Sequence, residues 1–73
     1  MHNNLKHARE AANKSQMQTA IYMDTTQAQL SKWENGRQDI TLSRAKRLAE
    51  YYNVSLDYLA GRTDEPKNPN VKD

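Results

Sequence analysis

Residues 25–36 read "TTQAQLSKWENG" and predict a short helix whose outer face is polar. Thr26 suits the N-cap position, and Gly36 suits the helix end because glycine adopts a positive φ without penalty. The helix should therefore run from Gln27 to Trp33, with Leu30 and Trp33 facing inward. At that position Trp33 belongs to the core and is not a platform for stacking bases.

The segment before this helix predicts a second helix, joined to the first by a tight turn. Ser15 is a good N-cap for a helix that ends near Tyr22, with Ala20 and Met23 facing inward. Two short helices joined by a short turn form a helix-turn-helix, here about residues 15–36. This arrangement projects the second helix outward, so one face of that helix must stay free of packing.

The free face carries side chains that are suited to reading DNA. Gln27 can donate and accept with one amide, which matches the N6/N7 edge of adenine. Ala28 and Ser31 are short enough to let the backbone approach a groove floor, and Lys32 can reach guanine or a phosphate. Residues 25–33 include no acid, which phosphate would repel. The alternative for each of these side chains is ordinary exposure to solvent.

The rest of the chain predicts three further helices and no strand. They run from about Leu5 to Asn13 after an Asn4 cap, from about Leu42 to Tyr52 after a Thr41 cap, and from Leu56 to Ala60 after a Ser55 cap. The inward stripe of the longest helix would be Leu42, Ala45, Leu48, Ala49 and Tyr52. Residues 64–73 contain both prolines and are typical of a disordered polar tail, which leaves residues 1–63 as the DNA-binding domain.

The composition is that of one small domain of 73 residues with an uneven charge. Residues 1–47 hold eight basic and four acidic residues, a net +4, whereas residues 48–73 hold three and five, a net −2. Such asymmetry suits an anionic partner, although a solvated mixed-charge surface is the alternative. No cysteine occurs, and His2 and His7 lack companions for a metal site. No apolar run could span a membrane, so we expect a soluble, cytoplasmic protein.

Two strings in the chain resemble one family of regulators. The first is "SQMQTAIYMDTTQAQLSKWENGR", residues 15–37, and the second is "YYNVSLDYLAGRTD", residues 51–64. Together they resemble the Cro/CI-type, or XRE, helix-turn-helix regulators of bacteria and phages, and the resemblance covers about residues 4–64. It implies a compact, all-α, five-helix fold of the lambda-repressor type and a function in binding operator DNA.

The resemblance also implies roles for individual residues. Gln16 matches a phosphate contact that supports the reading helix, and Arg9 and Glu34 match an ion pair between the first helix and the end of the third. Base-reading positions are matched by Gln27, Ala28 and Lys32, and backbone contacts after the reading helix by Asn35 and Arg37. Thr26, Ser31 and Arg44 complete the DNA-binding set, Arg44 as a phosphate contact because it lies near that loop.

Three residues depart from the family pattern. Asp24 stands where the turn usually has glycine, and Thr19 stands where leucine is preferred in the core. Ile40 stands where proline is common. Asp tolerates left-handed geometry better than most residues, so the turn can still form at some cost. None of the three removes a DNA contact, so we expect a less stable domain with the same function.

The sequence thus predicts a DNA-binding transcriptional regulator, a repressor that occupies a pseudo-palindromic operator as a homodimer. The expected contact is so small that pairing can depend on DNA. The dimer contact should involve residues 54–59, where Leu56, Tyr58 and Leu59 offer apolar surface. The alternative is an antitoxin-like protein-interaction module that binds through Met17 and Ile21, an i, i+4 pair otherwise expected at the core edge. No nucleophile–base pair or phosphate loop suggests an enzyme, and we expect no cofactor or small-molecule ligand.

Overall fold

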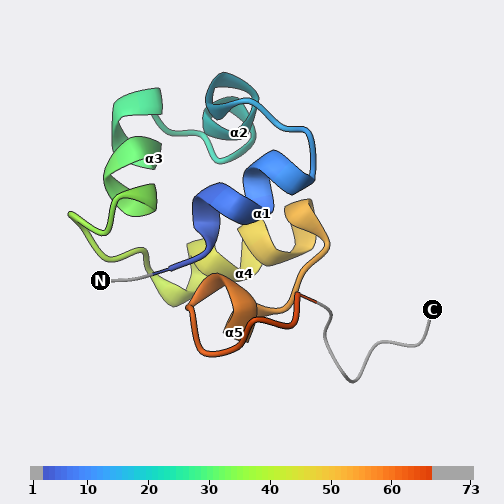
Figure 1. The fold of residues 1–73 in the computed structure, drawn as a ribbon. Coiled ribbons are helices and arrows are strands. Elements are labelled where there is room, and N and C mark those ends of the chain that lie inside the picture. The colour runs from blue at the N-terminus through green and yellow to red at the C-terminus, as the bar shows by residue number, and fades with distance from the viewer. Residues whose placement is uncertain (1–2, 67–73) are drawn as a thin grey trace.

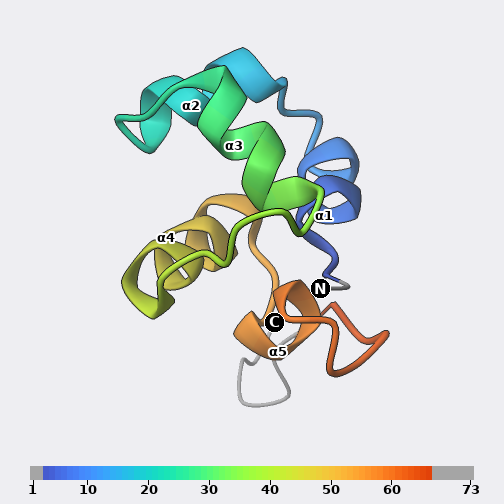
Figure 2. The same cartoon turned by 90° about the vertical axis from the view of Figure 1, so that its left-hand side faces the viewer.

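Residues 3–66, the part of the chain that the computed structural model describes, form five α-helices and no β-strand. The helices are α1 (Leu5–Ala11), α2 (Gln16–Tyr22), α3 (Gln27–Glu34), α4 (Leu42–Tyr52) and α5 (Leu56–Leu59). Figures 1 and 2 show α2 and α3 together at one end of the molecule and α5 at the other. α3 lies on the side that faces the viewer in Figure 2. The predicted all-α, five-helix fold is confirmed.

Four of the helices begin where a hydroxyl caps the first turn. Each cap residue accepts a hydrogen bond from the backbone N–H of the third helical residue; the caps are Ser15, Thr26, Thr41 and Ser55. The α2 cap is a full capping box, because the Gln18 side chain also accepts from the Ser15 N–H. These caps confirm the predicted starts of α2 to α5.

The start of α1 differs from the prediction. Asn4 makes no side-chain cap bond; instead the Asn3 Oδ1 accepts from the Leu5 N–H at 3.0 Å. The Asn4 amide is buried and donates to the Tyr58 carbonyl at 2.8 Å. Asn4 therefore connects α1 to α5 rather than capping its own helix.

Each helix ends in the same kind of left-handed turn. The residues with positive φ are Asn13, Asp24, Gly36, Asn53 and Gly61, one after each helix. Paired backbone bonds close each turn, as in Thr25 N–H to Ala20 O at 2.9 Å and Asp24 N–H to Ile21 O at 3.1 Å. This is the Schellman pattern. It ends α1 at Ala11, two residues before the predicted Asn13, and it shows that Asp24 adopts the geometry that glycine would take without strain.

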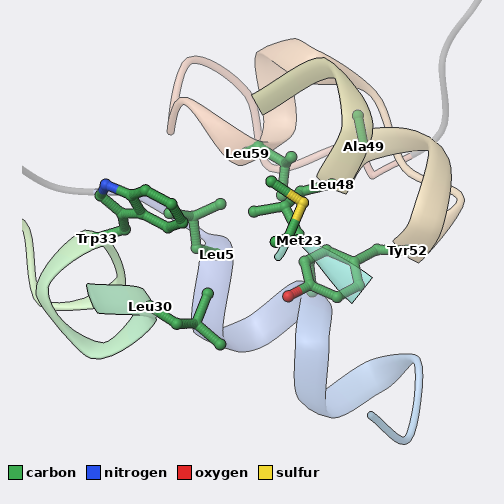
Figure 3. Close-up of a cluster of buried hydrophobic side chains, with 9 residues drawn as sticks. Leu5, Met23, Leu30, Trp33, Leu48, Ala49, Tyr52 and Leu59 are labelled. Atoms are coloured by element: carbon green, nitrogen blue, oxygen red, sulfur yellow. The ribbon is translucent and has the colours of Figure 1, made fainter. Parts of the chain in front are cut away.

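The core lies between α1, α3, α4 and α5 and includes the end of α2. Figure 3 shows Trp33 beside Leu5, and Met23 close to Leu48 and Tyr52. The complete buried cluster is Leu5, Ala8, Met23, Leu30, Trp33, Leu48, Ala49, Tyr52 and Leu59. Leu30 and Trp33 occupy it as predicted, and this burial fixes the opposite face of α3 toward the outside.

Several apolar side chains lie differently from the prediction. The sequence predicts Leu42 in the core, but this first residue of α4 is 63% exposed and lines a hollow. Met17 and Ile21 are 62% and 75% exposed, so the core-edge interpretation of that pair is wrong. Leu59 is buried to 2% exposure and is therefore no surface contact for a partner. Leu56 and Tyr58 are half-buried.

Two buried hydroxyls lack hydrogen-bond partners within the described residues. They are the Thr19 Oγ1 and the Tyr52 hydroxyl. Burial raises the pKa of Tyr52 to about 12, and the neighbouring Thr19 hydroxyl opposes that shift. Thr19 is fully buried, and an apolar residue in its place would leave no buried hydroxyl without a hydrogen bond.

The predicted polar tail, residues 64–73, lies outside the described residues from position 67 onward. Its first three residues follow α5, and the Pro66 carbonyl accepts a hydrogen bond from the Ser55 N–H at 2.7 Å. Ser55 is therefore bonded on both sides, to the tail through its N–H and to α5 through its hydroxyl.

Candidate DNA-binding surface

The reading helix α3 has two clearly different faces. Leu30 and Trp33 are 0% and 4% exposed, whereas Gln27, Ala28 and Lys32 are exposed. The half-buried residues Gln29 and Ser31 lie between these classes. The exposed face therefore presents an amide, a methyl group and an ammonium, with no carboxylate.

The first residue of α3 is held by a neighbouring amide. The Gln27 Nε2 donates to the Gln16 Oε1 at 3.2 Å, and the Gln16 Nε2 donates to the Glu34 Oε1 at 3.0 Å. Gln16 is the first residue of α2 and Glu34 is the last residue of α3. These bonds join both ends of the reading helix to one point on α2.

Arg9 completes this network from α1. Its Nε donates to the Glu34 Oε2 at 2.7 Å, its Nη2 to the Oε1 at 3.3 Å and its Nη1 to the Lys14 carbonyl at 3.0 Å. The Arg9 and Glu34 side chains are 11% and 2% exposed. The hydrogen bond to Glu34 raises the pKa of Arg9 above its ordinary value, so the guanidinium stays charged.

The loop after α3 is tied to the reading helix by side-chain bonds. The Asn35 Nδ2 donates to the Ser31 Oγ at 3.2 Å, and the Gln29 Nε2 donates to the Gln38 Oε1 at 2.8 Å. Arg37, between the two tethers, is exposed. This loop therefore presents a cation at a position that the reading helix fixes.

Arg44 lines a small hollow between α3, the loop that follows it and the start of α4. Its guanidinium sits 5.8 Å from the centre of the Trp33 ring, and its Nη1 is 3.5 Å from the Thr41 hydroxyl. The hollow has a volume of about 210 Å³ and is lined by Thr25, Gln29, Trp33, Gln38, Asp39, Thr41 and Arg44. The Thr26 hydroxyl accepts the Gln29 N–H, so its own bonding capacity is largely used by the helix cap.

Arg47 is engaged elsewhere. Its Nη2 donates to the Tyr22 carbonyl at 3.1 Å and its guanidinium lies over the Tyr22 ring. Tyr22 stacks on Tyr51 with 4.0 Å between ring centres, and the Lys14 Nζ lies over the Tyr51 ring, 5.0 Å from its centre. This stack ties α2 to α4, and it leaves Arg44 more available than Arg47 to bind a phosphate.

The structure brings some of the expected site residues together. Gln16, Gln27, Glu34 and Arg9 form one network, and Ser31 and Asn35 form a second contact. Lys32 and Arg37 make no side-chain hydrogen bond or ion pair within residues 3–66, and both are exposed, as is Ala28. Sequence reasoning missed the bond between Gln29 and Gln38, and no spacing in one sequence would reveal a contact between a helix and an irregular loop.

The fold and the exposed face of α3 define a helix-turn-helix domain. A family model described as Helix-turn-helix matches residues 5–59. The chain belongs to this family, that of the Cro/CI-type, or XRE, DNA-binding regulators. No curated protein and no solved structure matched the chain.

Residues 3–66 offer neither a metal site nor a membrane-spanning helix. No group of three or more His, Asp or Glu side chains there could hold a metal ion. None of the helices in that range has the length and apolar character needed to cross a membrane.

Proposed function

We propose that the protein is a sequence-specific repressor that places α3 in the major groove of an operator. The main support for this proposal is the outward face of α3. This face is free of acids and begins with Gln27, whose amide is hydrogen-bonded to Gln16. A groove lined by phosphate repels carboxylates, and a fixed amide reads a base at lower entropic cost. Occupancy of an operator near a promoter would exclude RNA polymerase. A protein with this function works in the cytoplasm, where the DNA is.

In this proposal the site residues divide into two groups. Gln27, Ala28 and Lys32 face the bases, with Ser31 at the edge of the groove. The phosphate-binding group surrounds them on α2, at the start of α3, in the loop after α3 and on α4. It comprises Gln16, Thr26, Asn35, Arg37 and Arg44. Phosphate contacts position the helix and carry no sequence information directly.

We propose further that two copies bind one pseudo-palindromic operator. A hollow of about 350 Å³ lies between the loop after α3, the start of α4 and α5, with Ile40, Leu42, Leu56 and Ala60 among its lining residues. The 63% exposure of Leu42 makes it the largest apolar contribution to this face. A second copy would cover Leu42 and Leu56, in place of the surface on Leu59 that the sequence suggested.

This dimer predicts the spacing of the operator. The half-site centres should lie about one helical turn apart, roughly 10–10.5 base pairs. Inserting five base pairs between them should turn one reading helix to the opposite side of the duplex and lower affinity toward that of a half-site. Undiminished binding to the lengthened operator would leave a monomeric reader.

A salt titration distinguishes a DNA-binding repressor from a module that binds another protein. Binding to mixed genomic DNA, followed by fluorescence anisotropy, should weaken steeply as salt rises, because phosphate contacts release counterions. Selection of bound genomic fragments should then recover sites upstream of genes, and a reporter fused to such a promoter should be repressed. Salt-insensitive binding or no enriched fragment would contradict the proposal.

The second candidate is a protein-interaction module. The observation that favours it is the exposed apolar pair on α2, Met17 and Ile21, one turn apart. Replacing both by glutamine should abolish the binding of a protein partner in that case and leave DNA affinity unchanged. A loss of repression without a loss of DNA binding would support this second function.

A further inference from the structure

One hydrogen-bonded chain connects a buried ion pair to the exposed start of the reading helix. It runs from Arg9 to Glu34, from Glu34 to Gln16 at 3.0 Å and from Gln16 to Gln27 at 3.2 Å. The Glu34 side chain is 2% exposed, whereas Gln27 is exposed. A buried charge therefore acts on the amide that faces the groove through one intermediate side chain.

The chemistry of the chain fixes the direction of every bond in it. A carboxylate only accepts hydrogen bonds, so Gln16 must turn its NH₂ group toward Glu34 and its oxygen toward Gln27. Gln27 must then turn its own NH₂ group toward Gln16. Its oxygen and its second N–H have no partner among residues 3–66 and are left for DNA. The orientation of the Gln27 amide is therefore set before DNA binds.

We propose that Glu34 is a positioning residue that determines which base Gln27 reads. The inference rests on the proposed function, in which Gln27 contacts a base. An amide that presents one donor and one acceptor matches the N7 acceptor and N6 donor of adenine. Guanine presents two acceptors on the same edge, so the Gln27 oxygen would face the guanine O6 without a proton between them.

Neutralising Glu34 should reverse the direction of the chain. In E34Q, the new amide would keep its oxygen on the Arg9 Nε, which makes the shorter bond at 2.7 Å. Its NH₂ group would then take the place of the Oε1, where it faces Gln16 and gives up the longer bond from the Arg9 Nη2 at 3.3 Å. Gln16 would then flip, and Gln27 would flip in turn, so that its donor and acceptor exchange places. The adenine contact is lost in that state, and the donor now faces the guanine O6 position.

Removing the intermediate should have a weaker effect. In Q16M the Arg9–Glu34 pair stays intact, and Gln27 becomes free to rotate in either direction. Guanine is then penalised less than before, although adenine is still accepted. The adenine-over-guanine ratio should fall in the order wild type, Q16M, E34Q.

The test uses the full chain and duplexes selected from a random DNA pool. The base pair read by Gln27 is the one at which Q27A erases discrimination. Affinities for duplexes with adenine or guanine at that position are measured by anisotropy for wild type, E34Q, Q16M and E50Q. The last is the matched control, because Glu50 is exposed on α4 and the variant removes the same charge.

We expect wild type and E50Q to prefer adenine by about 5- to 150-fold. We expect E34Q to lose at least about tenfold of that ratio and Q16M to lose a smaller part. A ratio in folded E34Q equal to that of E50Q overturns the inference. If E34Q fails to fold, an unchanged ratio in Q16M overturns it. If wild type shows no base preference that Q27A removes, the proposed function itself fails.

Discussion

Replacing Arg9 by alanine should remove a large part of the stability of the domain. The change leaves the Glu34 carboxylate 2% exposed and without its cation, and it deletes three hydrogen bonds that Arg9 donates. Breaking a buried pair by removing one partner costs about 3–5 kcal/mol. A chain of this size has a total unfolding free energy of roughly 4–11 kcal/mol. The variant should therefore be marginally folded at room temperature.

The assay is urea unfolding followed by the fluorescence of Trp33, which is the only tryptophan and is 4% exposed. Two further variants separate charge from packing. The double variant R9M/E34L should recover much of the loss, because an apolar pair of similar volume needs no charge compensation. R62A is the matched control, since Arg62 and Asp57 form a pair at 4.0 Å that is largely exposed, and it should unfold like the parent.

A loss below about 1 kcal/mol in the Arg9 variant would refute this reasoning. The pair would then behave like a surface contact despite its burial. A double variant as unstable as the single one would instead show that the shape of the site, and not an unpaired charge, accounts for the loss.

Replacing Arg37 or Arg44 by alanine should lower the slope of log affinity against log salt by about one unit each, as measured by anisotropy; an unchanged slope in both would place the phosphate-binding surface elsewhere. Asp24→Gly should raise the unfolding free energy by about 0.5–1 kcal/mol, because Asp24 has a φ of 55° that glycine adopts without strain, and an unchanged melting curve would show that the turn is unstrained. The pKa of Tyr52 is raised from 10.0 to about 12, so the folded state holds its proton longer than the unfolded state. The contribution of Tyr52 to the free energy of unfolding should be fully present below pH 10 and fall by about 1–3 kcal/mol toward pH 12. Tyr52→Phe should remove that part of the pH dependence in urea titrations.

The helices were predictable because their signals are local. The caps Ser15, Thr26, Thr41 and Ser55 are side chains that bond within their own first turn. The ends are equally local, since Gly36 and Gly61 have the positive φ expected of glycine. Asn13 adopts the same geometry, and because asparagine does so less reliably than glycine, the end of α1 was placed too late.

The misplaced side chains depend on tertiary contacts. Asn4 resembles a cap in sequence, but its amide donates to the carbonyl of Tyr58, 54 positions away. Leu42 fits the apolar period of α4, yet α5 lies too far from the first turn to cover it, and a hollow remains there. The sequence places Leu59 at the surface because one short helix can bury little, but in the structure it belongs to the core cluster with residues of α1 and α4.

The residues of the site were predictable as types, but of their connections only the Arg9–Glu34 pair was expected, and that expectation came from the family resemblance. Gln27 and Lys32 follow from the polar face of α3, and the structure leaves both exposed. The chain from Arg9 through Glu34 and Gln16 joins residues from three helices. A single sequence gives no periodicity for such contacts, so the order of the hydrogen bonds came only from the structure.

The central claim, that α3 reads bases through Gln27, is tested most directly by a cycle that alters both partners. The adenine at the position where Q27A erases discrimination is replaced by 7-deazaadenine, which lacks the N7 acceptor. Four affinities are then measured, for wild type and Q27A on each duplex. The account predicts a coupling free energy of about 1–3 kcal/mol, because each change removes the same bond. Additive losses, with a coupling near zero, would contradict a contact between Gln27 and that base.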